Sequence, residues 1–318
     1  MELSSKWPVK ELCEAMDISR SGFYKFKYRL AHPTDRVKKR MDNILLFEKY
    51  HEKYPSHGYR WLNAKIRLDL GLVMSDQYAH RCCKFAGILS QSKHYKYKKN
   101  NEEKRTFDNL VMASINMDGP LQVVVSDMTA FYVKSVYREL TLYMDLWDNE
   151  IVGYGLSNRK GDVDTYYNGL QQVVEKKKGL DGLKTILHTD HGSVYSSKSF
   201  NELLPQYRIT HSMSRVGTPT DNGAMEAING WAKTEMFIDF HIQDTDDVPK
   251  FVERYIKFFN EERPSYALGY LTPKAYKELY ANNPNCPKKP SRIKYAKKQK
   301  AIEQSQKEQK DEKVSINC

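Results

Sequence analysis

Hydrophobic residues follow the spacing of helices in the first hundred residues and the spacing of strands after about residue 106. Near the N-terminus the apolar positions recur every three or four residues, which places them on one face of a helix. They are Val9, Leu12, Cys13 and Met16. A turn at Asp17–Ile18 and an N-capping Ser19 predict a second helix directly afterwards. Two short helices joined by a tight turn are typical of a helix-turn-helix, and the second carries Arg20 and Lys25 as candidate DNA contacts.

A second helix-turn-helix candidate follows a polar linker at 30–40 and a helix predicted over 41–54. The sequence His-Gly-Tyr-Arg at 57–60 marks a break, after which a helix is expected over 61–70. Ser75 is placed to cap the next helix. The candidate DNA contacts of this unit are Arg60, Arg81 and Lys84. The alternative interpretation is that these helices form a small spacer packed on the core.

From about residue 106 the pattern changes to alternating strands and helices. Three consecutive strands are expected at 122–131, 139–146 and 150–156, followed by a helix at 164–177, a strand at 184–189, a helix at 197–204, a strand at 208–213 and a helix at 222–237. This order predicts an α/β domain with a mixed sheet. The expected organisation is a helix-turn-helix-like segment at 1–34, a helical DNA-binding domain with a basic linker at 35–105, a catalytic domain at 106–280, and a basic, partly disordered tail at 281–318.

Composition narrows the class of protein. The chain has 318 residues and a mean hydropathy of -0.71, and it contains no apolar run of about 18 residues, which argues against a membrane protein. Five cysteines without a CxxC pair do not form a disulfide framework, and the N-terminus lacks a signal-peptide pattern. We therefore expect a reduced, cytosolic protein with no membrane partner.

Charge is distributed unevenly along the chain. The net charge is +11 over residues 1–105, -6 over 106–280 and +6 over 281–318. Basic flanks are the electrostatic signature of polyanion binding, although a basic tail can also simply be solvated. An acidic middle suits a site for divalent cations. The distribution favours a nucleic acid as partner.

Three carboxylates stand at positions where active sites of α/β proteins form. Asp127 ends the run VVVSD and is expected at the carboxyl end of the first strand, and Asp190 ends ILHTD at the carboxyl end of another strand. Glu226 falls in the first turns of the helix after TPTDNGAM. Three converging carboxylates repel one another, and hard divalent cations such as Mg²⁺ or Mn²⁺ relieve that repulsion. Two such ions in one site can promote phosphoryl transfer. Each of these acids taken alone is more typical of a cap or a turn.

Neighbouring residues support the same site. On a helix, Asn222, Glu226 and Lys233 fall near one face, so that the lysine can hold a phosphate beside the metals. His188 and His191 flank Asp190, and we expect them to support the site without being ligands themselves.

The local sequences VSDMTAF, ILHTDHGSVYSS and SMSRVGTPTDNGAMEAINGWAKTE resemble the three catalytic motifs of DDE insertion-sequence transposases. The similarity is greatest to the OrfB product of the IS-three family, whose core is related to retroviral integrases. The family's triad maps onto Asp127, Asp190 and Glu226, with 35 residues between the last two, and its basic position maps onto Lys233. HGYRWLNAKI resembles the family's HGYR module, whereas the closing motif departs from the family because Ser265–Tyr266 follow Arg-Pro where a histidine is usual.

The resemblance implies a ribonuclease-H-like catalytic domain, two Mg²⁺ or Mn²⁺ ions per active site, and a bacterial, nucleoid-associated DNA transposase. Water would first cut DNA at the ends of the element, and the freed 3′-hydroxyl would then attack a second phosphodiester. It further implies a homo-multimer that holds two DNA ends with their terminal inverted repeats and target. The resemblance also allows an OrfA partner, because this family generally fuses or pairs OrfB with OrfA. Two alternatives are a repurposed DNA-binding repressor without catalysis and a ribonuclease-H-like nuclease without strand transfer.

Overall fold

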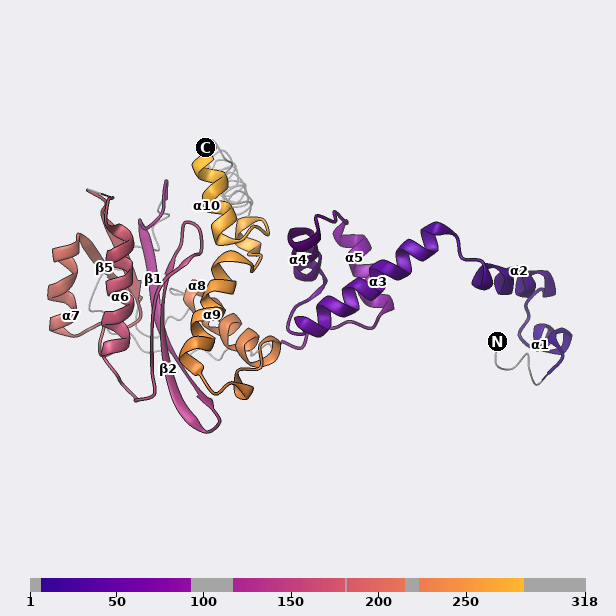
Figure 1. The fold of residues 1–318 in the computed structure, drawn as a ribbon, viewed down its shortest axis with the longest axis horizontal. Helices are drawn as coiled ribbons and strands as arrows, with labels where there is room; N and C mark the ends of the chain where they lie inside the picture. The colour runs from indigo at the N-terminus through magenta and orange to yellow at the C-terminus, as the bar shows by residue number, and fades with distance from the viewer. Residues whose placement is uncertain (1–6, 93–116, 181, 215–222, 283–318) are drawn as a thin grey trace, which may run out of the picture.

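The computed structural model describes residues 7–92, 117–180, 182–214 and 223–282. These residues form an elongated molecule in which the N-terminal helices lie at one end and the α/β domain lies at the other (Figure 1). The predicted tail and the linker at 93–105 lie almost entirely outside the described residues. Within the described ranges, no helix combines the length and the apolar character needed to cross a membrane.

Between residues 7 and 92 the chain forms five helices. They are α1 (Val9–Ala15), α2 (Arg20–Ala31), α3 (Asp35–Lys53), α4 (Tyr59–Leu70) and α5 (Asp76–Phe85). Both predicted serine caps are present, since the Ser19 hydroxyl accepts the Gly22 amide and the Ser75 hydroxyl accepts the Tyr78 amide. The predicted linker at 30–40 is wrong, because only three residues separate α2 from α3. Lysine and arginine favour helix, so a charged stretch following Pro33 extends α3 in solvent.

Five strands form one mixed sheet. They are β1 (Val123–Val133), β2 (Val136–Asp145), β3 (Ile151–Ser157), β4 (Thr185–Thr189) and β5 (Ile209–Met213). The spatial order is β3-β2-β1-β4-β5, in which β1, β2 and β3 pair antiparallel and β4 and β5 run parallel to β1. Three antiparallel strands followed by two parallel ones with intervening helices are the ribonuclease-H-like arrangement, so the predicted fold class is confirmed.

Helices cover both faces of this sheet. They are α6 (Asp164–Lys177), α7 (Lys198–Leu203), α8 (Gly223–Thr234), α9 (Val248–Glu261) and α10 (Pro273–Asn282). Helix α8 continues into a wider π-type turn at Glu235–Asp239, and short 3₁₀ turns lie at Leu204–Tyr207, Ile242–Asp244 and Tyr266–Leu268. Helices α6 and α7 lie on one side of β1, and α8 and α9 lie on the other (Figure 1).

Successive residues of β1 supply two different cores. Val124 is fully buried with Tyr143 and Leu187 in the core beneath α6 and α7. Val125 is buried in the core that also contains residues of α8 and α9, such as Met225 and Phe259. This period-2 alternation orients the odd-numbered residues of β1 toward α8. Asp127 follows Val125 by two positions and therefore lies on the same face.

The packing of α6 on the hairpin of β2 and β3 depends on two glycines of β3. A methyl group on Gly155 would lie 2.1 Å from the Thr165 carbonyl oxygen, and one on Gly153 would lie 2.3 Å from the Gly169 carbonyl oxygen. Because α6 lies against the strand backbone, no larger side chain fits between them.

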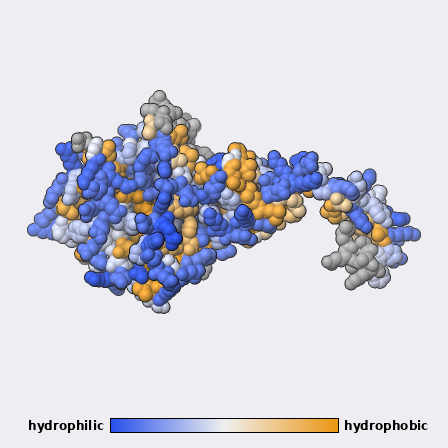
Figure 2. Space-filling model, in the orientation of Figure 1, coloured by the Kyte–Doolittle hydropathy of each residue, from blue (hydrophilic) through white to orange (hydrophobic). Residues whose placement is uncertain are grey.

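Helices α3 to α5 pack on the catalytic domain as well as on one another. Phe47 and Tyr54 of this unit belong to the same buried core as Phe258 of α9, with the rings of Tyr54 and Phe258 stacked at 6.0 Å. The Trp61 indole also donates to the Pro264 carbonyl at 3.1 Å. Figure 2 shows an apolar surface patch over α4 and α5, to which exposed Leu72, Val73 and other side chains contribute.

Candidate active site

Asp127 lies within β1, the middle strand of the sheet, and is half-buried. The predicted position at the carboxyl end of the strand is wrong, because β1 continues to Val133 in its antiparallel hairpin with β2. Its Oδ1 accepts the amide of Met128 at 2.9 Å, and its Oδ2 accepts the side-chain amide of Asn229 at 2.9 Å. Asn229 belongs to α8 and is only 5 % exposed. The hydrogen bond therefore joins the strand that carries Asp127 to the helix that carries position 226.

Asp190 lies directly after β4, on an exposed turn. Its Oδ1 accepts the amide of Gly192 at 2.9 Å, and a methyl group on Gly192 would lie 3.0 Å from that same oxygen. The turn thus orients the carboxylate through the backbone and leaves little room for a side chain at position 192.

Register brings the two aspartates to the same level of the sheet. Val125 of β1 pairs with His188 of the parallel β4, and each aspartate follows its strand's paired residue by two positions. Adjacent strands lie about 4.8 Å apart, so Asp127 and Asp190 lie near each other at this edge. The pKa of Tyr166 rises to about 12, mainly because the side chain is buried, and then because Glu139, Asp190 and Asp127 lie near it. Both aspartate charges therefore reach one neighbouring side chain.

Position 226 lies on α8, three residues before Asn229, which is about one helical turn. Its side chain and the whole of Asn222 lie outside the described residues. Lys233 occupies the last turn of α8, half-exposed and two turns beyond position 226. The helix is thus anchored on β1 with the predicted glutamate and lysine positions on the same side as Asn229.

The described part of the site suits a hard cation. Both aspartates present carboxylate oxygens, and the buried Oδ1 of Asn229 has no hydrogen-bond partner in the described part of the chain. Oxygen donors of this kind fit Mg²⁺ or Mn²⁺. No group of three His, Cys, Asp or Glu side chains converges among the residues that the structure describes, a set that excludes the Glu226 side chain.

The two histidines beside Asp190 differ in position. His188 is fully buried between β4 and β5, where Nδ1 lies 2.9 Å from the Ser212 hydroxyl and Nε2 lies 3.2 Å from the Ser214 hydroxyl. These contacts join neighbouring strands, which is a structural role. His191 is half-exposed on the turn. Burial chiefly, and then the charges of His188 and His191, lower the pKa of His211 to about 4.

The predicted DNA contacts are exposed on two separate helical units. Arg20 and Lys25 lie on α2, which has no buried residue. Arg60 lies at the start of α4, 4.0 Å from the carboxylate of Asp76. Arg81 and Lys84 lie exposed on α5. The structure therefore leaves all five cations accessible to a polyanion.

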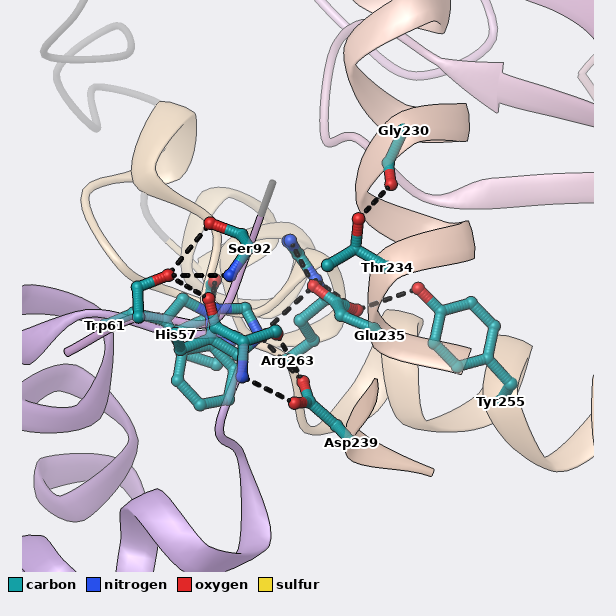
Figure 3. A network of polar contacts seen from close by, with 12 residues as sticks. His57, Trp61, Ser92, Gly230, Thr234, Glu235, Asp239, Tyr255 and Arg263 are labelled. Atoms are coloured by element: carbon teal, nitrogen blue, oxygen red, sulfur yellow. Dashed lines mark hydrogen bonds and ion pairs between the residues drawn. The ribbon is translucent and has the colours of Figure 1, made fainter. Parts of the chain in front are cut away.

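A buried polar network joins the HGYR segment to the end of α8 (Figure 3). The Arg263 guanidinium contacts both carboxylate oxygens of Glu235, with Nη2 at 2.7 Å from Oε1. His57 Nε2 lies 3.3 Å from Glu235 and 3.4 Å from Asp239, and Asp239 also accepts from the backbone and hydroxyl of Ser56. Burial by itself raises the pKa of Glu235, but Arg263 and then His57 outweigh it and lower that pKa to about 2.

Sequence reasoning does not find Asn229 or this network. Asn229 follows position 226 by one helical turn, and that spacing is an available signal. The network joins residues as far as 183 positions apart, such as Ser56 and Asp239, and no local pattern indicates such a pair. The network supports the interpretation that α3 to α5 form a spacer packed on the core. It does not cover the exposed face of α5, which stays accessible to DNA.

The integrase core domain family matches this chain over residues 117–219 and again over residues 207–273. The putative transposase InsK for insertion sequence element IS150 of Escherichia coli K12 is 29% identical over 279 residues, covering 87% of this chain and 95% of that protein. The transposase for insertion sequence element IS904 of Lactococcus lactis is 27% identical, covering 76% of this chain and 96% of that protein. A magnesium complex of the HTLV-2 integrase catalytic core domain is 18% identical with a TM-score of 0.39, covering 50% of this chain and 97% of that one.

A ribonuclease-H-like sheet of this topology, matched along its length by integrase core families, defines a polynucleotidyl transferase of the DDE class. The chain is similar to the IS150 and IS904 transposases over most of its length, and these relatives together with the integrase core domains support a DDE transposase of the insertion-sequence type.

Proposed function

We propose that the chain cuts the ends of an insertion sequence and joins the freed 3′-hydroxyl groups to target DNA. The observation that carries this proposal is the 2.9 Å hydrogen bond from Asn229 Nδ2 to Asp127 Oδ2. It anchors the helix of Glu226 on the strand of Asp127, while Asp190 lies at the same level on the neighbouring strand. This arrangement supports a site at one edge of the sheet that the three acids share.

In this proposal Asp127, Asp190 and Glu226 hold two Mg²⁺ or Mn²⁺ ions. Bound divalent ions would supply positive charge that activates the attacking oxygen and stabilises the leaving oxygen. Asn229 orients Asp127, and the Gly192 amide orients Asp190, so that the carboxylates are positioned before substrate binds. Lys233 holds a phosphate of the DNA strand next to the reacting one.

Both steps are displacements at phosphorus. In the first, water attacks the phosphodiester at the element end, the bond from phosphorus to the 3′-oxygen breaks, and that oxygen leaves with a proton as a 3′-hydroxyl. In the second, this hydroxyl loses its proton and attacks a target phosphodiester, from which another 3′-oxygen leaves. The number of phosphodiester bonds is conserved in the second step, so no energy source is required.

The DNA partners would be held by the two helical units. Arg20, Lys25, Arg60, Arg81 and Lys84 supply phosphate contacts, and their exposure supports this role. The similarity to the IS150 protein supports the OrfB type, which acts as a homo-multimer on paired inverted-repeat ends with an OrfA partner as an option. A nucleoid-associated location in the bacterial cytoplasm follows from action on chromosomal DNA.

The test uses the full chain with a labelled duplex that carries the ends of the DNA element encoding it, plus a supercoiled target. Wild type is expected to cut and join in the presence of Mg²⁺, whereas Asp190→Asn should lose about a hundredfold or more of both activities. Asp244→Asn is the matched control, since Asp244 is an exposed aspartate whose neighbour Gln243 bonds Tyr132, five residues along β1 from Asp127.

Each result separates the proposals. Cutting without joined product supports the nuclease alternative, and specific binding without cutting by wild type supports the repressor alternative. Equal activity of wild type and Asp190→Asn removes Asp190 from the catalytic site and contradicts the proposal.

A further inference from the structure

A groove of about 670 Å³ lies between the start of α4, the side of α8 and the segment 263–270. Its lining joins the HGYR segment to the catalytic domain and lies beside the polar network of Figure 3. Aromatic rings dominate it, and they are contributed by Tyr59, Trp61, Trp231, Tyr266 and Tyr270. No step of the proposed reaction uses this groove.

Trp231 and Tyr266 provide the accessible aromatic surfaces, and a buried column of rings lies behind Trp231. His57 stacks on Trp61 at 3.6 Å with an interplanar angle of 10°, and Trp231 continues this column nearly parallel to His57 at 5°. Trp231 remains 36% exposed and Tyr266 remains 68% exposed, which is high for aromatic side chains beside a groove. A planar ligand can therefore stack here without displacing the core.

The charge of the lining favours an anionic ligand. None of the described residues that line the groove is an aspartate or glutamate, whereas Arg60 and Arg263 both belong to it. Arg263 is neutralised by the buried Glu235. The Arg60 guanidinium lies 4.0 Å from the Asp76 carboxylate, and both groups are exposed. An exposed ion pair contributes little, so the charge of Arg60 remains available to an anionic ligand.

The groove begins one residue away from the catalytic position. Ala227 follows Glu226 and lines the groove, and Trp231 lies about 140° around α8 from position 226 at about 100° per residue. The surface between them includes Gly230, which is exposed, and a methyl group added there would meet nothing within 4 Å. A DNA strand leaving the catalytic acids can cross α8 at this point.

We propose that this groove binds an unstacked DNA base of the strand that crosses α8 from the cleavage site, with Trp231 and Tyr266 as the stacking surfaces and Arg60 on the adjoining phosphate. The inference rests on the proposed action on DNA. Base-to-aromatic stacking accepts any base, and it supplies affinity for a single strand that a paired duplex does not use.

The experiment uses the full chain without divalent cation, so that no strand is cut. The probe is a duplex with a short single-stranded overhang containing 2-aminopurine, whose fluorescence falls when the base stacks on an aromatic ring. Wild type should quench the overhang probe and leave unchanged the fluorescence of internal 2-aminopurine in a blunt duplex, which base stacking already keeps low. Trp231→Ala and Tyr266→Ala should lose the quenching and bind the overhang about tenfold more weakly, with blunt-duplex affinity unchanged.

Tyr132→Ala is the matched control, since Tyr132 is 60% exposed on β1, away from the groove lining. Tyr266→Ala is expected to fold normally, because a ring this exposed adds little to the core, so its loss of quenching would not reflect unfolding. If both groove variants quench the probe as strongly as wild type, the proposal is overturned. It is also overturned if Trp231→Ala changes the oligomeric mass without changing the quenching, because the groove then binds a second copy of the chain. If the protein cuts and joins DNA but does not quench the probe, only the base-binding site is contradicted. If it quenches the probe but shows no Mg²⁺-dependent cutting, the base-binding site stands and the proposed transposase activity is contradicted.

Discussion

Asn229 on α8 donates its side-chain amide to Asp127 on β1 across 2.9 Å, and its own Oδ1 is buried without a partner in the described part of the chain. One uncharged side chain thus attaches the helix of position 226 to the central strand. A neutral donor neutralises no charge, so the carboxylate of Asp127 keeps its full attraction for a cation.

Asn229→Asp should make stability dependent on divalent cations. The substitution places a second carboxylate against Asp127, and this repulsion should lower the free energy of unfolding by about 1–3 kcal/mol without metal. Added Mg²⁺ should restore part of that loss, which thermal unfolding in EDTA and in excess Mg²⁺ measures. Asn260→Asp is the control, because Asn260 bonds the backbone of Ile151 where α9 meets β3. An equal Mg²⁺ response in both variants would contradict the prediction.

Glu235→Gln should change the acid unfolding of the protein. The pKa of Glu235 is lowered from 4.5 to about 2 in the folded chain, so the ionised group stabilises folding above pH 4.5. This contribution is lost as the pH falls from 4.5 toward 2. The gap in unfolding free energy between wild type and Glu235→Gln should therefore narrow across that window, as measured by urea unfolding at each pH. The exposed Glu202→Gln should show no gap. A gap independent of pH would remove the Glu235 charge as its cause.

Gly155→Ala should destabilise the catalytic domain strongly. The added methyl group lies 2.1 Å from the Thr165 carbonyl oxygen, so α6 must move away from β3. Overpacking of this kind costs about 1–3 kcal/mol. Thermal unfolding measures the loss, with Gly119→Ala as the control because nothing lies within 4 Å of that position. Similar melting temperatures for the two variants would show that α6 does not pack closely on β3 in solution.

Arg81→Ala and Lys84→Ala should weaken DNA binding without regard to sequence. If each side chain contacts one phosphate, its loss should reduce the slope of log affinity against log salt by about 0.9. Fluorescence anisotropy of a duplex over a salt series measures this slope. Lys178→Ala, an exposed lysine of the catalytic domain paired with Glu175, is the control. Unchanged slopes for both α5 variants would favour α3 to α5 as a spacer alone.

Local patterns are sufficient for the order of the elements. The serine caps at Ser19 and Ser75, the strand periodicity of 122–131 and the helix at 164–177 depend on neighbours within a few residues. Short-range steric and capping preferences act on the same length scale as the sequence pattern, which is why these predictions are confirmed. The sequence pattern does not predict the start of α3 at Asp35, because charge by itself does not distinguish an exposed helix from a linker.

The side-chain environment of the site depends on longer distances. His188 next to Asp190 is a candidate supporting residue by sequence, but β5 and the residue after it surround it with Ser212 and Ser214. The roles of Asp127, Asp190 and Glu226 as a metal-binding triad remain predictions, since the described residues include two of these side chains. A residue's neighbours across the sheet are set by register, and register is not a local property.

By itself, the sequence determined the succession of helices and strands and the position of Asp190 directly after a strand, because periodicity and capping are read from adjacent residues. Only the tertiary structure decided that Asn229 bonds Asp127, that His57 lies between Trp61 and Trp231, and that an aromatic groove opens beside α8. Most of these contacts join segments about one hundred residues or more apart, and it is the burial of two cores against one sheet that brings them together.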